Sequence, residues 1–215
     1  MKLGIYGAGG LGREVYELAL RINIKSNRWS EIIFIDDADN PKKLRDISII
    51  NFQDLISVKN IEVCIAIGEP YVRKEIFLKL VSRKISITTL VDPDVSIPDS
   101  TKVGLGTIIC KYVSISSDVK IGKNVYVHPM ACIGHDSQIG NHSIISSYVD
   151  VAGECVIGSE TFLAIGTIMK QQIKIGSGSI LGMGSVVYNN ISDNLIAMGN
   201  PARPMKKNEE KKVFK

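Results

Sequence analysis

The chain has 215 residues, of which 45% are hydrophobic and 22% are charged, and its formal net charge is +4 at pH 7. This composition is typical of a globular protein with a core and excludes an intrinsically disordered chain. The basic residues are scattered until the end of the chain and no nucleic-acid motif accompanies them, so we expect no nucleic-acid binding.

The sequence contains no membrane-spanning segment. No apolar run approaches the about 18 residues that cross a bilayer. The N-terminus opens as a predicted strand, without the basic region and cleavage site of a signal peptide. We therefore expect a soluble, cytoplasmic protein without membrane insertion.

The first 90 residues alternate between predicted strands and helices. Strands are predicted over 2–6, 32–35 and 63–67, and a final strand over 85–91. Helical patterns follow the first strand and cover 71–81. This order indicates a small α/β domain, shorter than a full dinucleotide-binding fold, which needs two mononucleotide halves.

A glycine-rich turn, Gly7-Ala8-Gly9-Gly10-Leu11-Gly12, joins the first strand to the first helix. Strand, GxGxxG and helix in this order bring a phosphate group close to backbone N–H groups. The second strand ends at Asp36-Asp37, where a carboxylate can accept hydrogen bonds from ribose hydroxyls. We interpret the turn as a site for one nucleotide or a nucleotide-linked sugar; the alternative is a turn that serves only backbone geometry.

From Val91 to Val187 every sixth residue is aliphatic or methionine, without an insertion. A period of six fits neither an amphipathic helix nor an alternating strand, and irregularly spaced hairpins would show no fixed period. It predicts a parallel β-helix in which three hexapeptides make one coil. Glycine often follows the aliphatic residue, and we expect it to adopt backbone angles closed to other residues. These glycines are Gly104, Gly122, Gly134, Gly140, Gly158, Gly176 and Gly182.

Three histidines, His128, His135 and His142, follow one another at a spacing of seven. Residues of a β-helix stack only when a multiple of eighteen separates them, so one chain cannot bring all three to one metal and we predict no metal site. His135 is the candidate general base, with Asp136 as its partner if the corner brings them together; the alternative is a surface histidine. His128 is expected to line the same cleft, and His142 is interpreted as a solvated turn residue.

Together the glycine turn, Asp36-Asp37, the unbroken repeat, Gly134-His135-Asp136 and the closing Gly199-Asn200-Pro201-Ala202-Arg203 resemble the hexapeptide sugar acetyltransferases. The branch is that of sialic acid O-acetyltransferases and UDP-amino-sugar N-acetyltransferases of the bacillosamine type. The resemblance implies a Rossmann-like nucleotide-sugar-binding domain (1–90), a left-handed β-helix acetyltransferase domain (91–205) and a charged tail (206–215). It also implies a homotrimer with its active site between neighbouring β-helices.

The resemblance also implies roles for single residues. His135 would be the general base, helped by Asp136, and the Gly153 N–H would hold the thioester oxygen. Independently of the resemblance, the charged end of the chain predicts partial disorder beyond Lys206. The other positions that match the family are Gly9, Asp36, Asp37 and Gly68 for the nucleotide, with His128 beside them, Ile165, Gly166, Gly182 and Gly184 for the pantetheine arm, and Arg203 and Lys206 for coenzyme A phosphates.

The chain departs from the bacillosamine type at two positions, with His128 in place of Asn and Ile144 in place of a coenzyme-contacting His. These departures leave the identity of the acceptor sugar open.

The expected activity is acetyl-CoA-dependent N-acetylation of a nucleotide-linked amino sugar in bacterial surface-glycan biosynthesis, with acetyl-CoA as co-substrate and no metal. The alternatives are O-acetylation of sialic acid or another sugar, a nucleotide-dependent oxidoreductase built on the glycine turn, and a non-catalytic scaffold.

Overall fold

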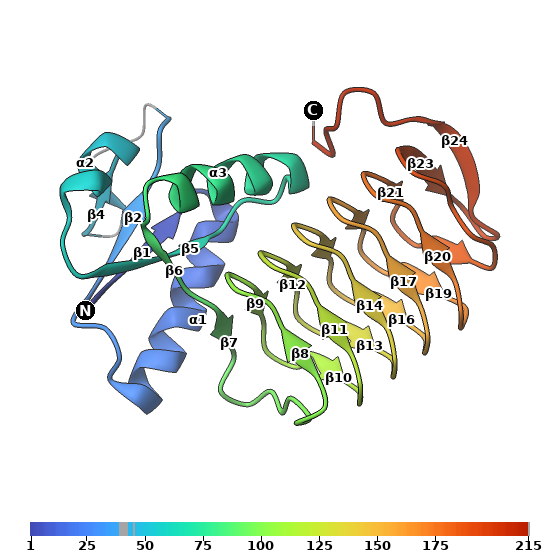
Figure 1. Cartoon of the computed structure of the whole chain (residues 1–215), viewed down its shortest axis with the longest axis horizontal. Helices are drawn as coiled ribbons and strands as arrows, with labels where there is room; N and C mark the ends of the chain where they lie inside the picture. Colours follow the sequence, from blue (N-terminus) through green and yellow to red (C-terminus); the bar gives the residue numbers. More distant parts are fainter. Residues whose placement is uncertain (39–42, 45, 215) are drawn as a thin grey trace.

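The computed structural model describes residues 1–38, 43–44 and 46–214. An α/β unit forms one end of the molecule and a parallel β-helix the other, with the two lying side by side (Figure 1). This is the fold class that the sequence predicts. None of the helices in the described ranges has the length and apolar character needed to cross a bilayer.

The α/β unit is built on one sheet with the strand order β3-β4-β2-β1-β5-β6. The chain places β2 and β4 on one side of β1 and β5 and β6 on the other, so the order reverses between β1 and β5. Only β3 pairs in the antiparallel sense among the described strands of this sheet. The elements are β1 (Lys2–Tyr6), α1 (Gly10–Ser26), β2 (Glu31–Ile35), β3 (Lys43–Leu44), β4 (Ile47–Ile50), α2 (Phe52–Ser57), β5 (Ile61–Ile65), α3 (Pro70–Ser82) and β6 (Ser86–Ile87).

The predicted strand over 85–91 is two strands. β6 extends the α/β sheet beside β5, whereas β7 (Leu90–Val91) pairs with β9 of the β-helix. The break falls between them because the backbone N–H groups of the two strands face different partners. The antiparallel β3–β4 pair and the short helix α2 were not predicted. The predicted strands over 2–6, 32–35 and 63–67 and the helix over 71–81 are confirmed within two residues, and a helix follows the glycine turn as predicted.

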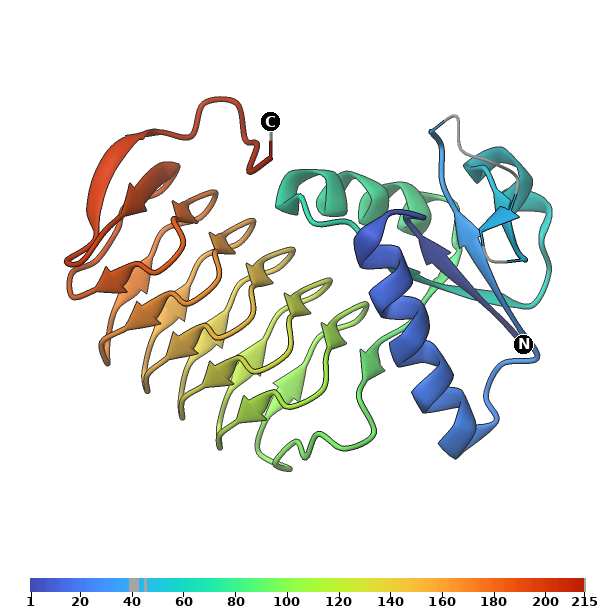
Figure 2. The same ribbon diagram turned by 180° about the vertical axis from the view of Figure 1, so that it is seen from behind.

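The β-helix consists of two-residue strands that pair in parallel with the strands eighteen residues before and after them, as in Ser114 with Cys132 and Cys132 with Asp150. The pairing forms three sheets, one on each face of the coil (Figure 2). The strands are β8 (Lys102–Val103), β9 (Ile108–Ile109), β10 (Ser114–Ile115), β11 (Lys120–Ile121), β12 (Tyr126–Val127), β13 (Cys132–Ile133), β14 (Gln138–Ile139), β15 (Ile144–Ile145), β16 (Asp150–Val151), β17 (Val156–Ile157), β18 (Phe162–Leu163), β19 (Ile168–Met169), β20 (Lys174–Ile175), β21 (Ile180–Leu181) and β22 (Val186–Val187).

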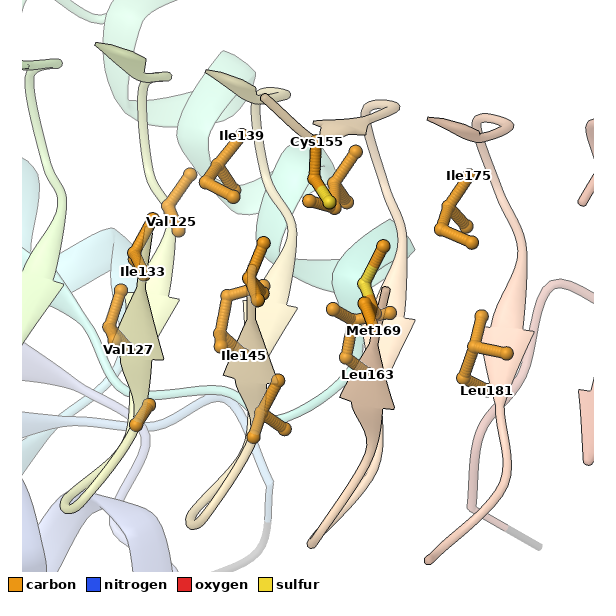
Figure 3. Packing of buried hydrophobic residues seen from close by; sticks show 14 of the residues in the cluster. Val125, Val127, Ile133, Ile139, Ile145, Cys155, Leu163, Met169, Ile175 and Leu181 are labelled. Atoms are coloured by element: carbon orange, nitrogen blue, oxygen red, sulfur yellow. The ribbon is translucent and has the colours of Figure 1, made fainter. Parts of the chain in front are cut away.

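The sixfold aliphatic positions point inward and stack in columns. Figure 3 shows members of these columns, among them Val127, Ile145, Leu163 and Leu181, which lie in register on successive coils. The position four residues later is also buried, and its polar members bond to the backbone of the next coil, as Ser137 Oγ donates to Ala152 O at 3.1 Å. Burial of these columns is the driving force for stacking, at about 25 cal/mol per Å² of apolar surface.

The repeat glycines have a different role from the one expected. None of the seven has a positive φ; instead a Cβ on Gly140 would lie 2.4 Å from the carbonyl carbon of Gly158 in the next coil. These positions therefore require glycine because neighbouring coils approach closely there. The left-handed backbone conformation falls at another position, which recurs every six residues from Gly106 to Gly184 and is mostly not glycine. Asp136 and His142 are two such corner residues, at φ +60° and +62°.

The chain closes with β23 (Leu195–Met198) and the antiparallel β24 (Arg203–Lys207), and residues 208–214 then run back across the coils to the start of α3 (Figure 1). Asn208 is buried, and its side chain donates to Gly178 O at 2.8 Å. The expectation of disorder beyond Lys206 is wrong for this segment, because its backbone and side chains have partners on both parts of the molecule.

Candidate active site

His135 and Asp136 form a pair at one corner of the β-helix, between β13 and β14. His135 Nδ1 lies 2.8 Å from Asp136 Oδ2, and both side chains are about half exposed. Adjacent residues of a strand face opposite ways, but the left-handed φ of Asp136 turns the two side chains together. An ionised carboxylate can only accept, so Nδ1 is the donor in this bond, and in a neutral ring Nε2 is then the acceptor.

The next coil brings Gly153 against this ring. Gly153 stands eighteen residues after His135, and a Cβ on it would lie 2.5 Å from Nε2. The absent side chain leaves the space that the imidazole occupies. The Gly153 carbonyl accepts from Gln172 N–H, whereas no described group accepts a hydrogen bond from the Gly153 N–H. An imidazole and a free backbone donor are therefore neighbours on successive coils.

A second carboxylate, that of Glu154, stands on the coil above Asp136. Its pKa is lowered by hydrogen bonds from Gln172 and Gln171, at 2.9 and 2.8 Å, and by the nearby His135. Sequence reasoning missed this residue, although the spacing of eighteen from Asp136 was a signal that could have found it. Acidic groups on two coils thus flank the imidazole.

A cavity of about 1080 Å³ lies between α1 and the sheet that contains β12, β15 and β18. His128, Ile165, Gly182 and Gly68 of the predicted site residues line it, and His135 does not. Burial, with a smaller contribution from the charge of Arg73, lowers the pKa of His128 to about 4, so this ring is neutral near pH 7. Half of the remaining lining consists of these apolar residues: Leu11, Leu18, Ile144, Phe162, Ala164, Ile180, Leu181, Met183, Val213 and Phe214.

The predicted pantetheine positions share the corner that follows β18 and β21. Gly166 and Gly184 have φ of +71° and +67°, and the space beside Gly184 is open. Ile165, which precedes Gly166, is 54% exposed. Arg203 and Lys206 are exposed on β24, outside the lining of the large cavity. The structure thus brings together Ile165, Gly166, Gly182 and Gly184, but at a different corner from His135.

The two aspartates after β2 are both held by the protein. Asp36 accepts from Ala8 N–H of the glycine turn at 2.8 Å and so fixes the turn. Asp37 accepts from Tyr6 Oη at 2.5 Å and Lys79 Nζ at 3.1 Å. Burial raises the pKa of Asp37, but these hydrogen bonds and one from the backbone outweigh it and leave the pKa below its usual value.

Gly9 and Gly68 of the predicted nucleotide site differ in their surroundings. No atom lies within 4 Å of the place where a Cβ would stand on Gly9, so its backbone faces open space. On Gly68 the Cβ would meet only the ring of Phe214, at 3.3 Å. Gly68 and the glycine turn end neighbouring strands, β5 and β1, at the same edge of the sheet. This edge is where open α/β sheets bind ligands.

The sequence predicts that His142 is a solvated turn residue, and the structure shows that this prediction is wrong. It is 9% exposed, its Nδ1 accepts from Asn124 Nδ2 at 2.9 Å, and its ring meets Phe77 of α3 edge to face. Burial lowers its pKa to about 4, helped by the charges of Arg73 and Lys74. The interpretation failed because the α/β unit covers this corner, and a repeat pattern carries no information about that contact.

Arg73 of α3 joins the two parts of the molecule. It is fully buried, and its guanidinium donates to Ile65 O at 2.6 Å in the α/β sheet and to Asn124 O and Oδ1 in the β-helix. Asn124 returns a hydrogen bond to Arg73 O at 3.0 Å. Burial lowers the pKa of Arg73 to about 10, so the group is still charged at neutral pH.

No three metal-binding side chains gather at one place in the described part of the chain.

The family model described as the PglD N-terminal domain matches residues 2–80, and the model for bacterial transferase hexapeptide repeats matches residues 118–153. No curated protein matches the sequence.

Several solved structures match the chain over almost its whole length. WeeI from Acinetobacter baumannii is 27% identical, with a TM-score of 0.89 over 95% of this chain and 100% of that one. The acetyltransferase domain of PglB from Neisseria gonorrhoeae, solved with acetyl coenzyme A, is 27% identical, with a TM-score of 0.88 over 95% and 98%.

A variant of perosamine N-acetyltransferase from Caulobacter crescentus, solved with CoA and GDP-perosamine, is 22% identical. Its TM-score of 0.89 over 96% of this chain and 98% of that one shows a shared fold. The two family models and the neighbours at 27% identity agree with the order of α/β unit and β-helix described above. The chain thus has an N-terminal domain that matches the PglD type followed by bacterial transferase hexapeptide repeats, and over almost its whole length it is similar to solved sugar acetyltransferases.

Proposed function

We propose that this protein is an acetyl-CoA-dependent N-acetyltransferase that acts on the amino group of a nucleotide-linked sugar in surface-glycan biosynthesis. The observation that carries the proposal is the placement of the His135–Asp136 pair against Gly153 of the next coil. It is supported by a PglB domain that binds acetyl coenzyme A and by a perosamine N-acetyltransferase that binds CoA and GDP-perosamine.

The reaction is a direct transfer. The acceptor amine attacks the thioester carbonyl, and His135 Nε2 takes the proton that the amine loses. Asp136 holds the Nδ1–H and stabilises the imidazolium that forms. The free N–H of Gly153 donates to the oxygen on which negative charge develops, a contribution of about 3–4 kcal/mol in comparable sites. Collapse of the tetrahedral intermediate expels the coenzyme A thiolate.

Donor and acceptor are assigned to different parts of the chain. Residues 91–205 carry the transfer, with the pantetheine arm along Ile165, Gly166, Gly182 and Gly184. Residues 1–90 hold the nucleotide, with Gly9 and Gly68 at the backbone and Asp36 and Asp37 around it, and His128 of the β-helix lies beside it. Arg203 of β24, together with Lys206 at the start of the charged tail (206–215), meets the coenzyme A phosphates.

A complete site requires a second copy of the chain. His135 lies at the corner between β13 and β14. The cavity and the positions proposed for the pantetheine arm, here called the groove, lie at the corner after β12, β15 and β18. Within one chain the proposed base is therefore at a different corner from the proposed acetyl-CoA site. We propose a homotrimer in which the His135 corner of one β-helix meets the groove of its neighbour. Exposed apolar side chains along the groove corner support this contact: Tyr112, Met130, Tyr148, Ile165 and Met183.

Two measurements test the proposal. The first is release of free coenzyme A from acetyl-CoA with UDP-, GDP- and dTDP-amino sugars as acceptors, with product mass as the readout. A gain of one acetyl group on a nucleotide-linked amine is expected; acetylation of free sialic acid alone, or reduction of NAD(P), contradicts it. The second is light scattering during gel filtration, where three chain masses are expected.

We place the reaction in the cytoplasm, where acetyl-CoA and nucleotide sugars are made.

A further inference from the structure

The large cavity reaches the α/β unit at the point where its strand order reverses. Gly10, after β1, and Gly68, after β5, both line the cavity, and so do Val213 and Phe214. The crevice between the carboxyl ends of two such strands is the ligand site of open α/β sheets. Residues 208–214, called here the return segment, therefore form one wall of this crevice.

Glu69 fixes the return segment in place. Its carboxylate accepts from the backbone N–H groups of Val213 at 2.9 Å and Phe214 at 2.7 Å. Glu69 directly precedes α3 but makes no capping bond to that helix, so its side chain serves the segment. Hydrogen bonds to a carboxylate are about twice as strong as those between neutral groups. Asn208 anchors the other end on the β-helix.

The ring of Phe214 is positioned on two sides and free on the others. It meets the ring of Phe162 edge to face, with centroids 5.7 Å apart and an interplanar angle of 87°. Gly68 lies against its edge, where any other residue would place a Cβ 3.3 Å from the ring. More than half of the Phe214 side chain is nevertheless exposed, at the cavity wall. An aromatic ring held in this way is a platform on which a flat ring stacks.

We propose that Phe214 is a nucleobase-stacking residue, and that the return segment, held by Glu69, completes the acceptor cavity. The inference rests on the proposed function, because it takes the nucleotide of the acceptor as the ligand. Every base has a π-face, so stacking adds affinity without selecting the base. Phe214 therefore contributes to binding of uridine, guanosine and thymidine diphosphates alike.

The test is calorimetric titration of UDP, GDP and dTDP into the wild-type protein and the Phe214→Ala variant. Loss of the platform is expected to weaken the best-binding nucleotide by about tenfold, since removing a stacking aromatic costs about 1–3 kcal/mol per base. Binding of acetyl-CoA stays within twofold. Glu69→Gln, which removes the charge that holds the segment, is expected to weaken nucleotide binding severalfold.

Two matched variants control for unspecific effects. Glu75→Gln changes an exposed carboxylate on α3, the helix that follows Glu69. Glu210→Ala changes an exposed carboxylate on the return segment. Both are expected to bind nucleotide as the wild type does. Melting temperatures of all variants establish that the fold is retained.

A tryptophan at position 214 gives a direct signal. The chain has one tryptophan, Trp29, which is 2% exposed in the α/β core and is not part of the cavity. Phe214→Trp keeps a stacking surface, so it is expected to retain wild-type affinity, and its emission is quenched when a base stacks on it. This readout holds even if the alanine variant does not fold.

The outcomes separate the two proposals. Equal nucleotide affinity in Phe214→Ala, or tighter binding, overturns the stacking role while acetyl transfer to a nucleotide sugar survives. Phe214→Trp emission that a bound nucleotide leaves unchanged does the same. A wild-type protein that binds acetyl-CoA but none of the three nucleotides overturns the acceptor class and the stacking role together.

Discussion

The imidazole of His135 lies over the α-carbon of Gly153, one coil further along, with Nε2 2.5 Å from where a Cβ would stand. A methyl group at this position would overlap the ring. Because the His135 side chain is about half exposed, it can move away, so Gly153→Ala displaces the proposed base without breaking the coil. We expect a loss of kcat of about tenfold or more, typical of a misplaced catalytic group, with an unchanged melting temperature.

The matched control for Gly153→Ala is Asn189→Ala, which follows β22 as Gly153 follows β16 and is exposed. It is expected to keep wild-type kcat. If Gly153→Ala turns over at the wild-type rate, the imidazole is not held at Gly153 during the reaction.

His135→Ala removes the proposed base. We expect kcat to fall about 100-fold or more, while the melting temperature and acetyl-CoA affinity stay as in the wild type. Asp136→Asn keeps the size of the side chain but loses the charge opposite Nδ1, so its loss is expected to be smaller. Steady-state kinetics with a nucleotide amino sugar measures both. A His135→Ala enzyme with near wild-type turnover would exclude the base role.

Arg73→Met tests the junction of the two parts. The change leaves the carbonyls of Ile65 and Asn124 without their donor in a buried site, so we expect the free energy of unfolding to fall by about 3 kcal/mol. Arg73→Lys is not expected to restore it, because one ammonium cannot reproduce the planar set of donors. Urea unfolding measures the difference, and Arg83→Met, an exposed arginine just after the same helix, is the control.

His142 makes the fold sensitive to acid. Its pKa is about 4 in the folded state, against about 6.5 for an unfolded histidine. Between these values the unfolded chain binds a proton that the folded chain does not, so stability is full above pH 6.5 and is lost as the pH falls toward 4.

His142→Gln removes this contribution. The drop in the free energy of unfolding between pH 7 and pH 5 is expected to shrink by about 1–2 kcal/mol. Denaturant unfolding at the two pH values measures it, with the wild type as reference. If the free energy of unfolding drops by the same amount in both proteins, His142 is protonated as readily in the folded state as in the unfolded state, which contradicts the prediction.

Two glycine substitutions distinguish a glycine that a neighbouring coil requires from a glycine whose backbone faces open space. Gly140→Ala puts a methyl group 2.4 Å from the backbone of the next coil, so we expect it to destabilise the fold by several kcal/mol. Gly9→Ala meets no atom within 4 Å and is expected to fold normally. If Gly9 faces a phosphate, the alanine variant binds UDP, GDP or dTDP more weakly; melting curves and titration distinguish the two effects.

The β-helix was predictable because its signal is local and periodic. The sixfold register and the pairing at eighteen residues follow from the sequence. The sequence left open whether His135 and Asp136 converge at a corner, and the structure shows that they do. The role of the repeat glycines was predicted wrongly, since a pattern shows that a side chain is absent but not whether φ or a neighbouring backbone requires it.

Contacts between distant segments were not predictable. Arg73 has the pattern of a charged residue on a helix, and its partner Asn124 lies 51 residues away. Phe214 and its anchor Glu69 are 145 residues apart. Neither pair leaves a periodic trace, and in each case only the docking of the α/β unit on the coils brings the members together. For the same reason His142 was placed in solvent.

The spacing of eighteen residues between His135 and Gly153 also sets a limit on evolutionary change in this chain. The gap between the proposed base and the proposed donor equals one rung, about 4.8 Å, and the ladder of main-chain hydrogen bonds maintains it without any adjustable loop. A whole rung inserted before His135 or after Gly153 would lengthen the prism and leave this pair intact. The same insertion between the two residues would separate the proposed proton acceptor from the proposed anion donor by a full step, so we expect the length of the chain between them to be constant.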